Sequence, residues 1–487
     1  MKYLWKLWEW FDDRTGLGGL IGPMLTHPVP RASKWAYVFG SATLFAFILQ
    51  VVSGVALAMA YVPASGHAYD SLKYISEHPL GNFLRGVHYF GASAMVILIG
   101  AHTVRVFLFA SYKYPREVSW LSGVVLLGLT MGMGFTGQLL RWDQNGVWSV
   151  IVCAEMMGRV PFIGEYLAHF VLAGQNIGGA TLSRFFDFHV FAIPALIFGF
   201  VGLHLWLVLR NGISEPPVKG RPVDPKTYRE WYHNLVKRDG VPFFPDAAWR
   251  DMVFGASMLS LVALAALVWG PPELTNPPDP SLLNADPRPD WYLLWYFALL
   301  ALLPHGTEDY FLIYGPLLAG LWLFIVPFIR PYGERHPAKR PWAVASVMLV
   351  VIMIAVLGVE GNRSPWSPDF EAKPLPASIV GTDVGPVAEG ALIWHKKGCE
   401  NCHNISGFGG RRGPDLTFIG DKLTEDQLTL RIINGGYNMP AFAGNISHND
   451  LRSLVAFLKS RRHVYNDAPD VASPAPVTPS PKVVPTP

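Results

Sequence analysis

The segment RGVHYFGASAMVILIGAHTVR, residues 85–105, determines the fold expected for this chain. Between its two terminal arginines it has no charged residue, and it is long enough to cross a bilayer as a helix. It also contains His88 and His102, although lipid offers no hydrogen-bond partner to an imidazole. The segment therefore predicts a transmembrane helix whose histidines bind a group inside a helix bundle.

The composition of the whole chain is that of a membrane protein. Of the 487 residues, 51% are hydrophobic and only 15% are charged, which is too few charges for an ordinary soluble protein. The net charge of +3 is nearly balanced and gives no reason to expect a nucleic-acid partner. The three cysteines exclude a disulfide framework, because two of them share one short motif and Cys153 then has no partner.

Uncharged stretches of about 20 residues predict an all-α fold, a polytopic bundle of seven transmembrane helices with a small α-helical domain after it. The predicted spans are residues 35–62, 84–110, 119–140, 183–210, 251–270, 311–330 and 341–359. Lys and Arg accumulate in the loops after the second, fourth and sixth spans. By the positive-inside rule, the N-terminus is cytoplasmic and the region after residue 360 lies outside.

The chain divides into six predicted regions. They are a cytoplasmic amphipathic segment (1–34), a four-helix domain (35–215), a three-helix domain (216–360), a Pro-rich linker (361–384), a compact domain (385–463) and a disordered Pro-rich tail (464–487). The first region has aromatic residues at helical spacing and lacks the apolar core of a signal peptide. We therefore expect an interfacial helix that lies on the membrane surface.

The seven spans contain four histidines, which form two matched pairs. His88 and His102 lie in the second span with a spacing of i, i+14, and His189 and His204 lie in the fourth with a spacing of i, i+15. Each separation is close to four helical turns, or about 21 Å, so each pair lies near one face of its helix. Both spans run from outside to inside, which places His88 level with His189 near the outer surface. His102 and His204 are level near the inner surface.

Each level therefore predicts an iron site with two imidazole ligands. Imidazole is a good ligand for iron, and a haem held between two helices would satisfy nitrogens that lipid cannot. We expect two non-covalent b-type haems, one near each surface. A hydrogen bond to a neighbouring helix is the alternative for each single histidine, but four histidines in matched register favour haem.

Glycines repeat the histidine spacing in the neighbouring spans. Gly40 and Gly54 in the first span, and Gly123 and Gly137 in the third, both have the i, i+14 spacing. A flat macrocycle packed against a helix needs missing side chains at its own level, which is the role we predict for them. Ordinary close packing of helices explains any one glycine, but two pairs with the histidine interval favour haem packing.

Two arginines lie close to the histidines in the second span. Arg85 precedes His88 by three residues, and Arg105 follows His102 by three. Each is placed to contact haem propionates at its own surface, and snorkelling of the side chain to that surface is the alternative.

The motif CENCH, residues 399–403, predicts a third haem. In this motif the thiols of Cys399 and Cys402 attach a haem c covalently, and His403 is the proximal ligand. The following GPDL segment is expected to place the Pro414 carbonyl against the other ring nitrogen of His403. Covalent haem c is attached outside the cytoplasm, which agrees with the orientation given by the charges.

A sixth ligand for the haem c iron is expected some tens of residues later. Met439, in GGYNMPAF, is the predicted ligand, and His448 and His463 are the alternatives. Histidine with methionine raises the potential of the iron, which suits an electron acceptor.

With these motifs, the chain resembles the cytochrome b family of the Rieske/cytochrome bc complexes over residues 20–360. The b6f type is the most similar, with histidine spacings of 14 and 15, seven spans, and WDQ at residues 142–144. The last three spans resemble subunit IV of that type, fused here to the four-span part. Residues 385–463 resemble a small class I cytochrome c. The outer loop reads PDWY at residues 289–292, where the family has PEWY.

The resemblance implies the membrane core subunit of a quinol:cytochrome c reductase, a proton-translocating oxidoreductase. Quinol would be oxidised at the outer face. One electron would pass to a Rieske iron–sulfur protein and then to the fused haem c, and the other through the two b haems to an inner quinone site. The implied quinol site comprises Pro289, Asp290, Trp291 and Tyr292.

Within that site, the resemblance implies that Asp290 and Tyr292 are catalytic, with Asp290 as proton acceptor. A carboxylate in an apolar quinol pocket has a raised pKa, as a general base working near neutral pH requires. The alternative role for Asp290 is to cap the apolar helix that follows. Expected partners are a separate Rieske subunit, a downstream cytochrome c or terminal oxidase, membrane lipid and a second copy of the complex. The expected location is a bacterial plasma membrane, with the cytochrome c domain in the periplasm.

Four positions depart from the family pattern. Asp290 is one methylene shorter than the family glutamate, and Arg141 replaces a proline before WDQ, which introduces a charge beside the quinol pocket. Val38 stands where the b6f type has the cysteine of an additional inner haem, and Leu209, just before Arg210, stands where it has an associated arginine. We therefore predict no additional inner haem, and the sequence assigns no residue to the inner quinone site.

Two other functions are open at the level of sequence. A dihaem membrane anchor would pass electrons between a dehydrogenase and the quinone pool without bifurcation, and it would need no outer PDWY loop. A transporter or scaffold with a tethered cytochrome c would use its membrane histidines structurally and would contain no haem b.

Overall fold

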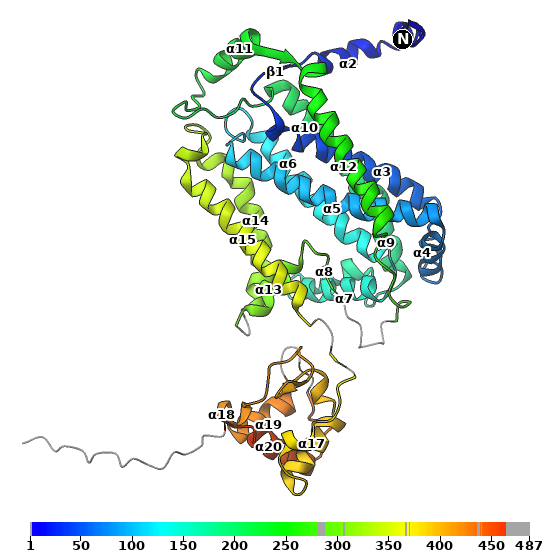
Figure 1. The fold of residues 1–487 in the computed structure, drawn as a ribbon, viewed down its shortest axis with the longest axis vertical. Coiled ribbons are helices and arrows are strands. Elements are labelled where there is room, and N and C mark those ends of the chain that lie inside the picture. The colour runs from blue at the N-terminus through cyan, green and yellow to red at the C-terminus, as the bar shows by residue number, and fades with distance from the viewer. Residues whose placement is uncertain are drawn as a thin grey trace, which may run out of the picture. The chain divides into compact units, whose positions relative to one another are not determined.

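The computed structural model describes residues 2–279, 288–304, 307–365, 368–369, 371–435, 439 and 441–463. The predicted tail, 464–487, lies outside the described residues. The chain separates into two compact units, Met1–Ser364 and Pro365–Pro487. Each unit is described by itself, with the elements labelled as in Figure 1.

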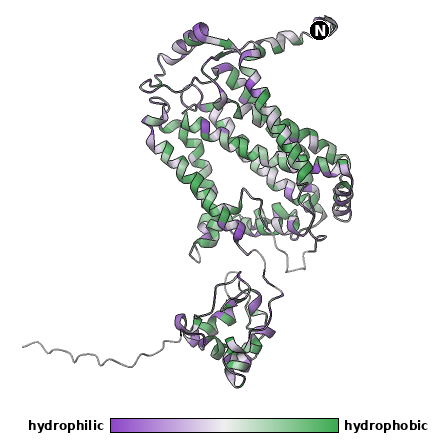
Figure 2. Ribbon diagram, viewed as in Figure 1, coloured by the Kyte–Doolittle hydropathy of each residue, from purple (hydrophilic) through white to green (hydrophobic). Residues whose placement is uncertain are grey.

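Among the described residues of unit 1, seven helical segments are long and apolar enough to cross a membrane. They are α3 (Phe39–Ala58), α5 (Pro79–Leu108), α6 (Glu117–Leu139), Gly179–Asn211, Phe243–Val268, α14 (Glu308–Ile329) and α15 (Pro341–Arg363). Figure 2 shows apolar residues along these helices and more hydrophilic ones on α11. The all-α bundle with seven spans is thus confirmed, although the second span begins at Pro79 rather than at residue 84.

Two of the spans depart from a regular helix. The fourth span consists of α9 (Gly179–Asp187), a π-helical turn (Phe188–Ala192) and α10 (Ile193–Asn211). The fifth consists of Phe243–Ala247, where the extended backbone of Phe244 makes a kink, and α12 (Ala248–Val268). A π-turn adds a residue to one turn of a helix and is frequent at functional sites.

Shorter elements cover the two ends of unit 1. The helices are α1 (Lys2–Thr15), α2 (Leu17–Leu25), α4 (Ala68–Glu77), α7 (Gln144–Gly158), α8 (Gly164–Leu172), α11 (Tyr228–Asp239) and α13 (Leu294–Leu302), with 3-10 turns at Trp35–Tyr37 and Pro337–Lys339. Strands β1 (Pro28–Pro30) and β2 (Gly240–Pro242) pair antiparallel. In Figure 1, α7, α8 and α13 lie at the opposite end of the unit from α11, β1 and α2.

The core of unit 1 lies where α3, α5 and α12 pack together, and α6 packs on α10 beside it. Small residues allow this close approach, as is usual between membrane helices. For example, a Cβ added at Gly86 in α5 would come within 3.0 Å of the Ala266 Cβ in α12.

Unit 2 is a small helical domain. Its elements are α16 (Ala377–Val380), α17 (Pro386–Lys396), a 3-10 turn (Cys399–Asn401), β3 (Asn404–Ile405), β4 (Phe408–Gly409), α18 (Ile419–Lys422), α19 (Glu425–Asn434) and α20 (His448–Lys459). Helix α17 crosses α20 at Gly390, where an added Cβ would meet the Ser453 carbonyl oxygen. The buried side chains of Trp394, Leu454 and Phe457 form the centre of the core.

A buried charge network joins the last two spans of unit 1 to its first four at the α11 end. Glu215, just after α10, pairs with Arg335 from the loop between α14 and α15, and both side chains are almost fully buried. Glu215 also accepts a hydrogen bond of 2.8 Å from the Tyr228 hydroxyl, to which Arg116 donates at 2.7 Å. The pair therefore has additional hydrogen bonds that offset the cost of burying two charges.

The same loop supplies cations to the C-terminal end of α5. Arg335 donates to the Phe109 carbonyl at 3.2 Å, and Arg340 donates to those of Phe107 and Leu108 at 3.1 and 3.0 Å. The last carbonyls of a helix have no partner within the helix, and guanidinium groups both satisfy them and complement the helix dipole.

We expect Arg335→Met to destabilise the protein, because it leaves Glu215 as a buried, unpaired charge. Breaking a buried pair in this way costs about 3–5 kcal/mol. The measurement is a thermal melt of the purified protein in detergent. Arg238→Met is the matched control, since it breaks an exposed pair with Asp239 and should leave the melting temperature unchanged. Equal melting temperatures for the two variants would show that the Glu215–Arg335 pair does not stabilise the bundle.

Candidate functional site

The two histidines predicted near the outer surface meet between α5 and the fourth span. The ring centroids of His88 and His189 lie 6.2 Å apart, with the ring planes at 75°. A separation of about 6 Å is what two imidazoles have when each binds one metal ion at about 2 Å. His189 lies in the π-helical turn Phe188–Ala192, which the sequence pattern did not indicate.

Hydroxyl groups of the neighbouring spans hold these two rings. Ser53 Oγ of α3 lies 2.9 Å from Nδ1 of His88, and Thr136 Oγ1 of α6 lies 3.1 Å from Nδ1 of His189. A hydrogen bond at one ring nitrogen fixes the orientation of the ring and leaves the other nitrogen for a metal. The Nε2 atoms of both rings are therefore the nitrogens suited to bind iron.

The inner pair has the same construction with one difference. Ser122 Oγ of α6 lies 2.8 Å from Nδ1 of His204. His204 is near enough to His102 to act on it electrostatically. Nδ1 of His102 is buried and has no hydrogen-bond partner among the described residues.

Each predicted glycine faces one of the histidines across a helix contact. The distances from an added Cβ to the histidine Cε1 are 3.1 Å for Gly40 and His102, 3.2 Å for Gly54 and His88, 3.6 Å for Gly123 and His204, and 2.7 Å for Gly137 and His189. The glycines therefore make room for the imidazole rings themselves. This gives a physical reason for the repeat of the histidine interval in the first and third spans.

The two arginines of α5 differ in their contacts. Arg85 donates to Ser76 Oγ at 2.9 Å and to the Pro272 carbonyl at 2.5 Å. Arg105 stacks on Tyr37, with its Cζ 4.6 Å from the ring centroid, and its Nε is buried without a hydrogen-bond partner in the described structure. Of these two arginines, Arg105 therefore has an unpaired N–H donor, its Nε, and it lies three residues after His102 of the inner pair.

Several buried polar atoms at the inner level have no partner among the described residues. They are His102 Nδ1, Arg105 Nε and Ser119 Oγ. Buried polar groups are normally hydrogen-bonded, so these unpaired atoms suit a level that binds a polar group. A haem between His102 and His204 would bring propionates that the Arg105 guanidinium could bind, and the residues of this level therefore fit a haem.

In unit 2, the CENCH motif and its surroundings fit a covalent haem. The Pro414 carbonyl oxygen lies 2.9 Å from Nδ1 of His403, as the GPDL segment predicts. Gly413 admits the same ring, since an added Cβ would come within 2.5 Å of its Cε1. Cys399 and Cys402 are free thiols, and the turn Cys399–Asn401 begins at the first of them.

The three proposed sixth ligands of the haem c lie in different surroundings. Met439 packs against the core cluster that contains Trp394, whose ring lies 6.1 Å from that of His403. His463 stacks on Phe418 at 3.6 Å and is hydrogen-bonded to Asp421 at 2.8 Å. His448 is exposed at the start of α20. Met439 is therefore the ligand best placed in the core.

The PDWY loop lies against α5 and α6. Trp291 Nε1 donates to Ser93 Oγ of α5 at 3.2 Å, and the Tyr292 hydroxyl donates to Asp290 Oδ2 at 2.8 Å. Tyr292 is admitted by Gly134 of α6, where an added Cβ would collide with its hydroxyl oxygen. Burial raises the pKa of Asp290 above the usual aspartate range, and the Tyr292 hydrogen bond and the charge of Arg141 oppose that shift.

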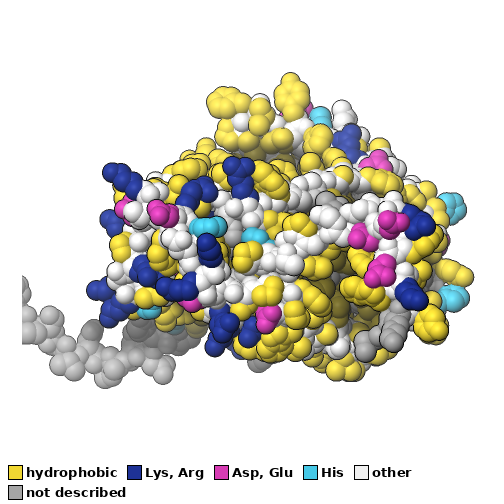
Figure 3. Space-filling model, turned by 90° about the horizontal axis from the view of Figure 1, so that it is seen from above, with side chains coloured by type: hydrophobic (Ala, Val, Ile, Leu, Met, Phe, Trp, Pro, Cys, Tyr) yellow, Lys and Arg dark blue, Asp and Glu magenta, His cyan; other side chains and the backbone are white. Residues whose placement is uncertain are grey.

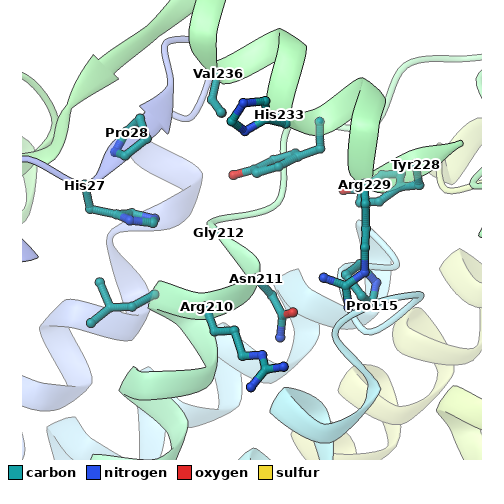
Figure 4. Close-up of a pocket in the computed structure, with 12 residues that line it drawn as sticks. His27, Pro28, Pro115, Arg210, Asn211, Gly212, Tyr228, Arg229, His233 and Val236 are labelled. Atoms are coloured by element: carbon teal, nitrogen blue, oxygen red, sulfur yellow. The ribbon is translucent and has the colours of Figure 1, made fainter. Parts of the chain in front are cut away.

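A pocket of about 240 Å³ opens at the other end of unit 1, beside α11. Figure 4 shows side chains from four segments around it, namely residues 27–28, Pro115, the end of α10 and α11. The lining residues are His27, Pro28, Pro115, Leu209, Arg210, Asn211, Gly212, Tyr228, Arg229, Tyr232, His233 and Val236. Sequence reasoning missed this pocket, although Leu209, a departure from the family pattern, and its neighbour Arg210 both line it.

His27 is the lining residue with an unused polar atom. Its Nε2 is buried and has no hydrogen-bond partner among the described residues. Burial lowers the pKa of His27, so its ring is neutral at neutral pH. At this end of the unit, Figure 3 shows Lys and Arg side chains gathered over one side of the face. The exposed cations of its loop and helix are Lys219, Arg221, Lys226, Arg229, Lys237 and Arg238.

Three family models match parts of the chain. Residues 24–212 match cytochrome b/b6/petB, residues 279–374 match cytochrome b(C-terminal)/b6/petD, and residues 385–458 match cytochrome C oxidase, cbb3-type, subunit III. Together they cover the first four spans, the PDWY loop with the last two spans, and the domain that carries CENCH.

Individual proteins are similar over the same parts. The menaquinol:cytochrome c reductase cytochrome b subunit of Geobacillus thermodenitrificans is 38% identical over 221 residues, which are 43% of this chain and 98% of that one. The cytochrome b/c1 of Bradyrhizobium diazoefficiens is 30% identical over 364 residues, which are 73% of this chain but only 50% of that one. A chain of a structure titled hyperthermophilic respiratory Complex III superposes with a TM-score of 0.62 at 26% identity, covering 73% of this chain and 91% of that one.

Gly137→Ala should disturb the outer histidine pair, because the added Cβ would force His189 to move. Overpacking of this kind costs about 1–3 kcal/mol, so we expect weaker binding of one b-type haem and retention of the other. The measurement is the reduced-minus-oxidised absorbance spectrum per mole of protein. Gly128→Ala in the same helix is the control, since its Cβ would meet nothing within 4 Å. A spectrum of Gly137→Ala that equals the control would contradict this role of the glycine.

Proposed function

Because the chain belongs to the cytochrome b family and carries a C-terminal cytochrome c domain, we propose that it is the core of an enzyme that bifurcates the electrons of quinol. It is a multi-pass membrane protein and a cytochrome b subunit of a bc-type quinol:cytochrome c reductase. The arrangement that carries the proposal is the two levels of histidines together with the PDWY loop at one end. Each of the four rings faces a glycine, and three of them are held by a hydroxyl.

The proposed haems are two of b type and one of c type. His88 and His189 would hold the outer b haem, and His102 and His204 the inner one, while Cys399, Cys402, His403 and Met439 would hold haem c. When bound, these groups supply one-electron carriers at fixed positions. Ser53, Thr136 and Ser122 orient three of the four imidazoles, and the packed helices around them exclude water.

The two b-haem levels provide a path for charge across the membrane. The helical spacing of the histidines separates the levels by about 21 Å. Moving one electron across the full membrane requires about 2.3 kcal/mol per 100 mV of potential. Oxidation of quinol at one face and reduction of quinone at the other would store that energy as a transmembrane potential.

At the outer face, Asp290 is the proposed proton acceptor. Oxidation of one quinol releases two electrons and two protons. One electron would go to a Rieske protein and then to haem c, and the other to the outer b haem. Asp290 would take one proton from a quinol hydroxyl, and the second proton would go to water on the outer side. Its hydrogen bond with Tyr292 fixes the direction of the carboxylate, and burial raises its pKa, which is the direction that a general base working near neutral pH needs.

The pocket beside α11 is our proposed inner quinone site. It follows directly on the inner histidine level, because Leu209 lies five residues after His204 in α10. A pocket of a few hundred Å³ is the size that a small molecule of quinone size needs, and the lining here combines aromatic and apolar side chains with polar and basic ones. His27 and His233 supply ring nitrogens there for hydrogen bonds to the quinone oxygens.

The proposed partners are a separate Rieske protein, a downstream cytochrome c or oxidase, lipid and a second copy of the complex. A Rieske centre needs cysteine and histidine ligands, and two of the three cysteines here belong to CENCH. We propose that the α11 end is cytoplasmic, since its exposed loop is rich in Lys and Arg. Unit 2 would then be on the outer side, where haem c is attached.

The proposed bifurcation predicts a paradoxical response of the b haems. Because the second electron of quinol is released to a b haem only when the first leaves through the Rieske protein, addition of ferricyanide should transiently increase b-haem reduction. The measurement is stopped-flow absorbance of the purified complex mixed with excess quinol. Oxidation of the b haems on adding ferricyanide would indicate a non-bifurcating anchor instead.

His27→Leu should slow the reoxidation of the reduced b haems by quinone while leaving their reduction by quinol unchanged. Loss of a proton-transferring or hydrogen-bonding group costs about 10²-fold or more in rate. His169→Leu is the control, because His169 is exposed on α8 at the other end of the bundle. If His27→Leu and the control reoxidise equally fast, His27 takes no part in quinone reduction.

A further inference from the structure

Arg141 occupies the corner between α6 and α7 and is fixed there from two sides. Its Nη2 donates to Asp143 Oδ2 at 2.6 Å and to the Glu273 carbonyl at 3.0 Å, and only 19% of its side chain is exposed. Its Nε is buried and has no hydrogen-bond partner among the described residues. Arg141, which stands where the family has a proline, is therefore a cation that hydrogen bonds hold in place at this corner.

The same corner holds the loop that carries the quinol residues. The backbone N–H of Thr275 donates to Asp143 Oδ2 at 3.0 Å, and that of Arg288 donates to Asn145 Oδ1 at 3.0 Å. Asp290 follows Arg288 by two residues. The corner and the acidic residue are therefore connected by a short, hydrogen-bonded stretch of chain.

Tyr292 places Asp290 against the C-terminal part of α6, which leads into the corner. The Tyr292 hydroxyl packs against Gly134 and donates to Asp290. Gly134 lies five residues before the end of α6 at Leu139, or about 7.5 Å along the axis, and Arg141 follows two residues after that end. Arg141 acts on Asp290 electrostatically, and Tyr89 of α5 interacts with both of them.

The charge of Arg141 is available to Asp290 although Arg141 is paired with Asp143. The Asp143 side chain is fully buried and also accepts hydrogen bonds from Gly146 at 2.9 Å and from Thr275 at 3.0 Å. It caps the N-terminus of α7, where the helix dipole further stabilises a negative charge. Asp143 thus has hydrogen-bond donors besides Arg141, and the charge of Arg141 lowers the pKa of Asp290.

We propose that Arg141 is a positioning residue for quinol oxidation: its guanidinium fixes the corner that carries the PDWY loop and stabilises the Asp290 carboxylate in the ionised form that accepts the quinol proton. This inference rests on the proposed function. In the step concerned, the O–H bond of a quinol hydroxyl breaks and an O–H bond to Asp290 forms, while the electron leaves to the Rieske protein.

The need for such a cation follows from the surroundings of Asp290. Burial alone favours the protonated acid, which has no site for a further proton. The groups that face Asp290 are Tyr292 from its own loop, Tyr89 from α5 and Arg141 from the corner. Arg85 of α5 is a second cation in the cluster, and it interacts with both Arg141 and Asp143. Of these groups, Arg141 alone is a cation that acts directly on Asp290 among the described residues.

The test is the pH dependence of kcat/KM for quinol oxidation by the purified complex, with cytochrome c as acceptor. The rate should rise with pH until Asp290 is ionised. Arg141→Met should move this rise to higher pH by about one unit, or about tenfold in rate on the acidic side. Arg141→Lys keeps the charge and should retain the wild-type profile.

Two control variants distinguish loss of the Arg141 charge from a structural disturbance of the corner between α6 and α7. Arg141→Met leaves Asp143 buried without its cation, so the double variant Arg141→Met/Asp143→Asn, which keeps a capping side chain, should show the same shift with an unchanged b-haem spectrum. Arg159→Met breaks an Arg–Asp pair with Asp309 elsewhere in the unit and should leave the profile unchanged.

The variant Asp290→Asn distinguishes an error in the proposed role of Arg141 from an error in the proposed function of the protein. If Asp290→Asn abolishes the pH-dependent rise while both Arg141→Met variants keep the wild-type profile, Arg141 has no such role and the proposed function stands. If Asp290→Asn retains the wild-type rate and profile, Asp290 is not the proton acceptor. The proposed role of Asp290 and the proposed role of Arg141 are then both wrong.

Discussion

Four imidazoles buried among apolar helices are the constraint on which the bundle depends. In lipid, an unsatisfied ring nitrogen costs several kcal/mol, so each ring must have a hydrogen-bond partner, a metal or both. Hydroxyls of α3 and α6 satisfy Nδ1 of three rings, and a glycine opposite each ring makes the close approach of the helices possible. These contacts therefore fix the relative height of α3, α5, α6 and the fourth span.

Much of this arrangement could be predicted from sequence, because it repeats at helical intervals. The seven spans, the pairing of histidines and the register of the glycines follow from apolar length and from spacings close to four helical turns. The hydroxyl partners could not be predicted in this way. Ser53, Ser122 and Thr136 resemble any small residue in an apolar helix until the neighbouring span is placed. The π-turn at His189 has no signal in the sequence, since the spacing from His189 to His204 also fits a regular helix.

Contacts between distant segments account for what the sequence did not indicate. Arg141 reads as an isolated charge beside WDQ, yet the folded chain supplies Asp143 and the Glu273 carbonyl to it. Glu215 and Arg335 are far apart in the sequence and pair only after the α14–α15 loop meets the end of α10. The pocket beside α11 likewise joins residues from four separated segments. These contacts depend on tertiary packing, which a single sequence does not show.

If the two histidine levels hold haem b and unit 2 holds haem c, the purified protein contains both kinds of haem in a fixed ratio. The most direct measurement is the pyridine haemochrome spectrum of the purified protein, which distinguishes non-covalent from covalent haem and counts both. We expect two haems b for each haem c. A preparation with haem c but no haem b would show that the membrane histidines have a structural role only and do not bind haem.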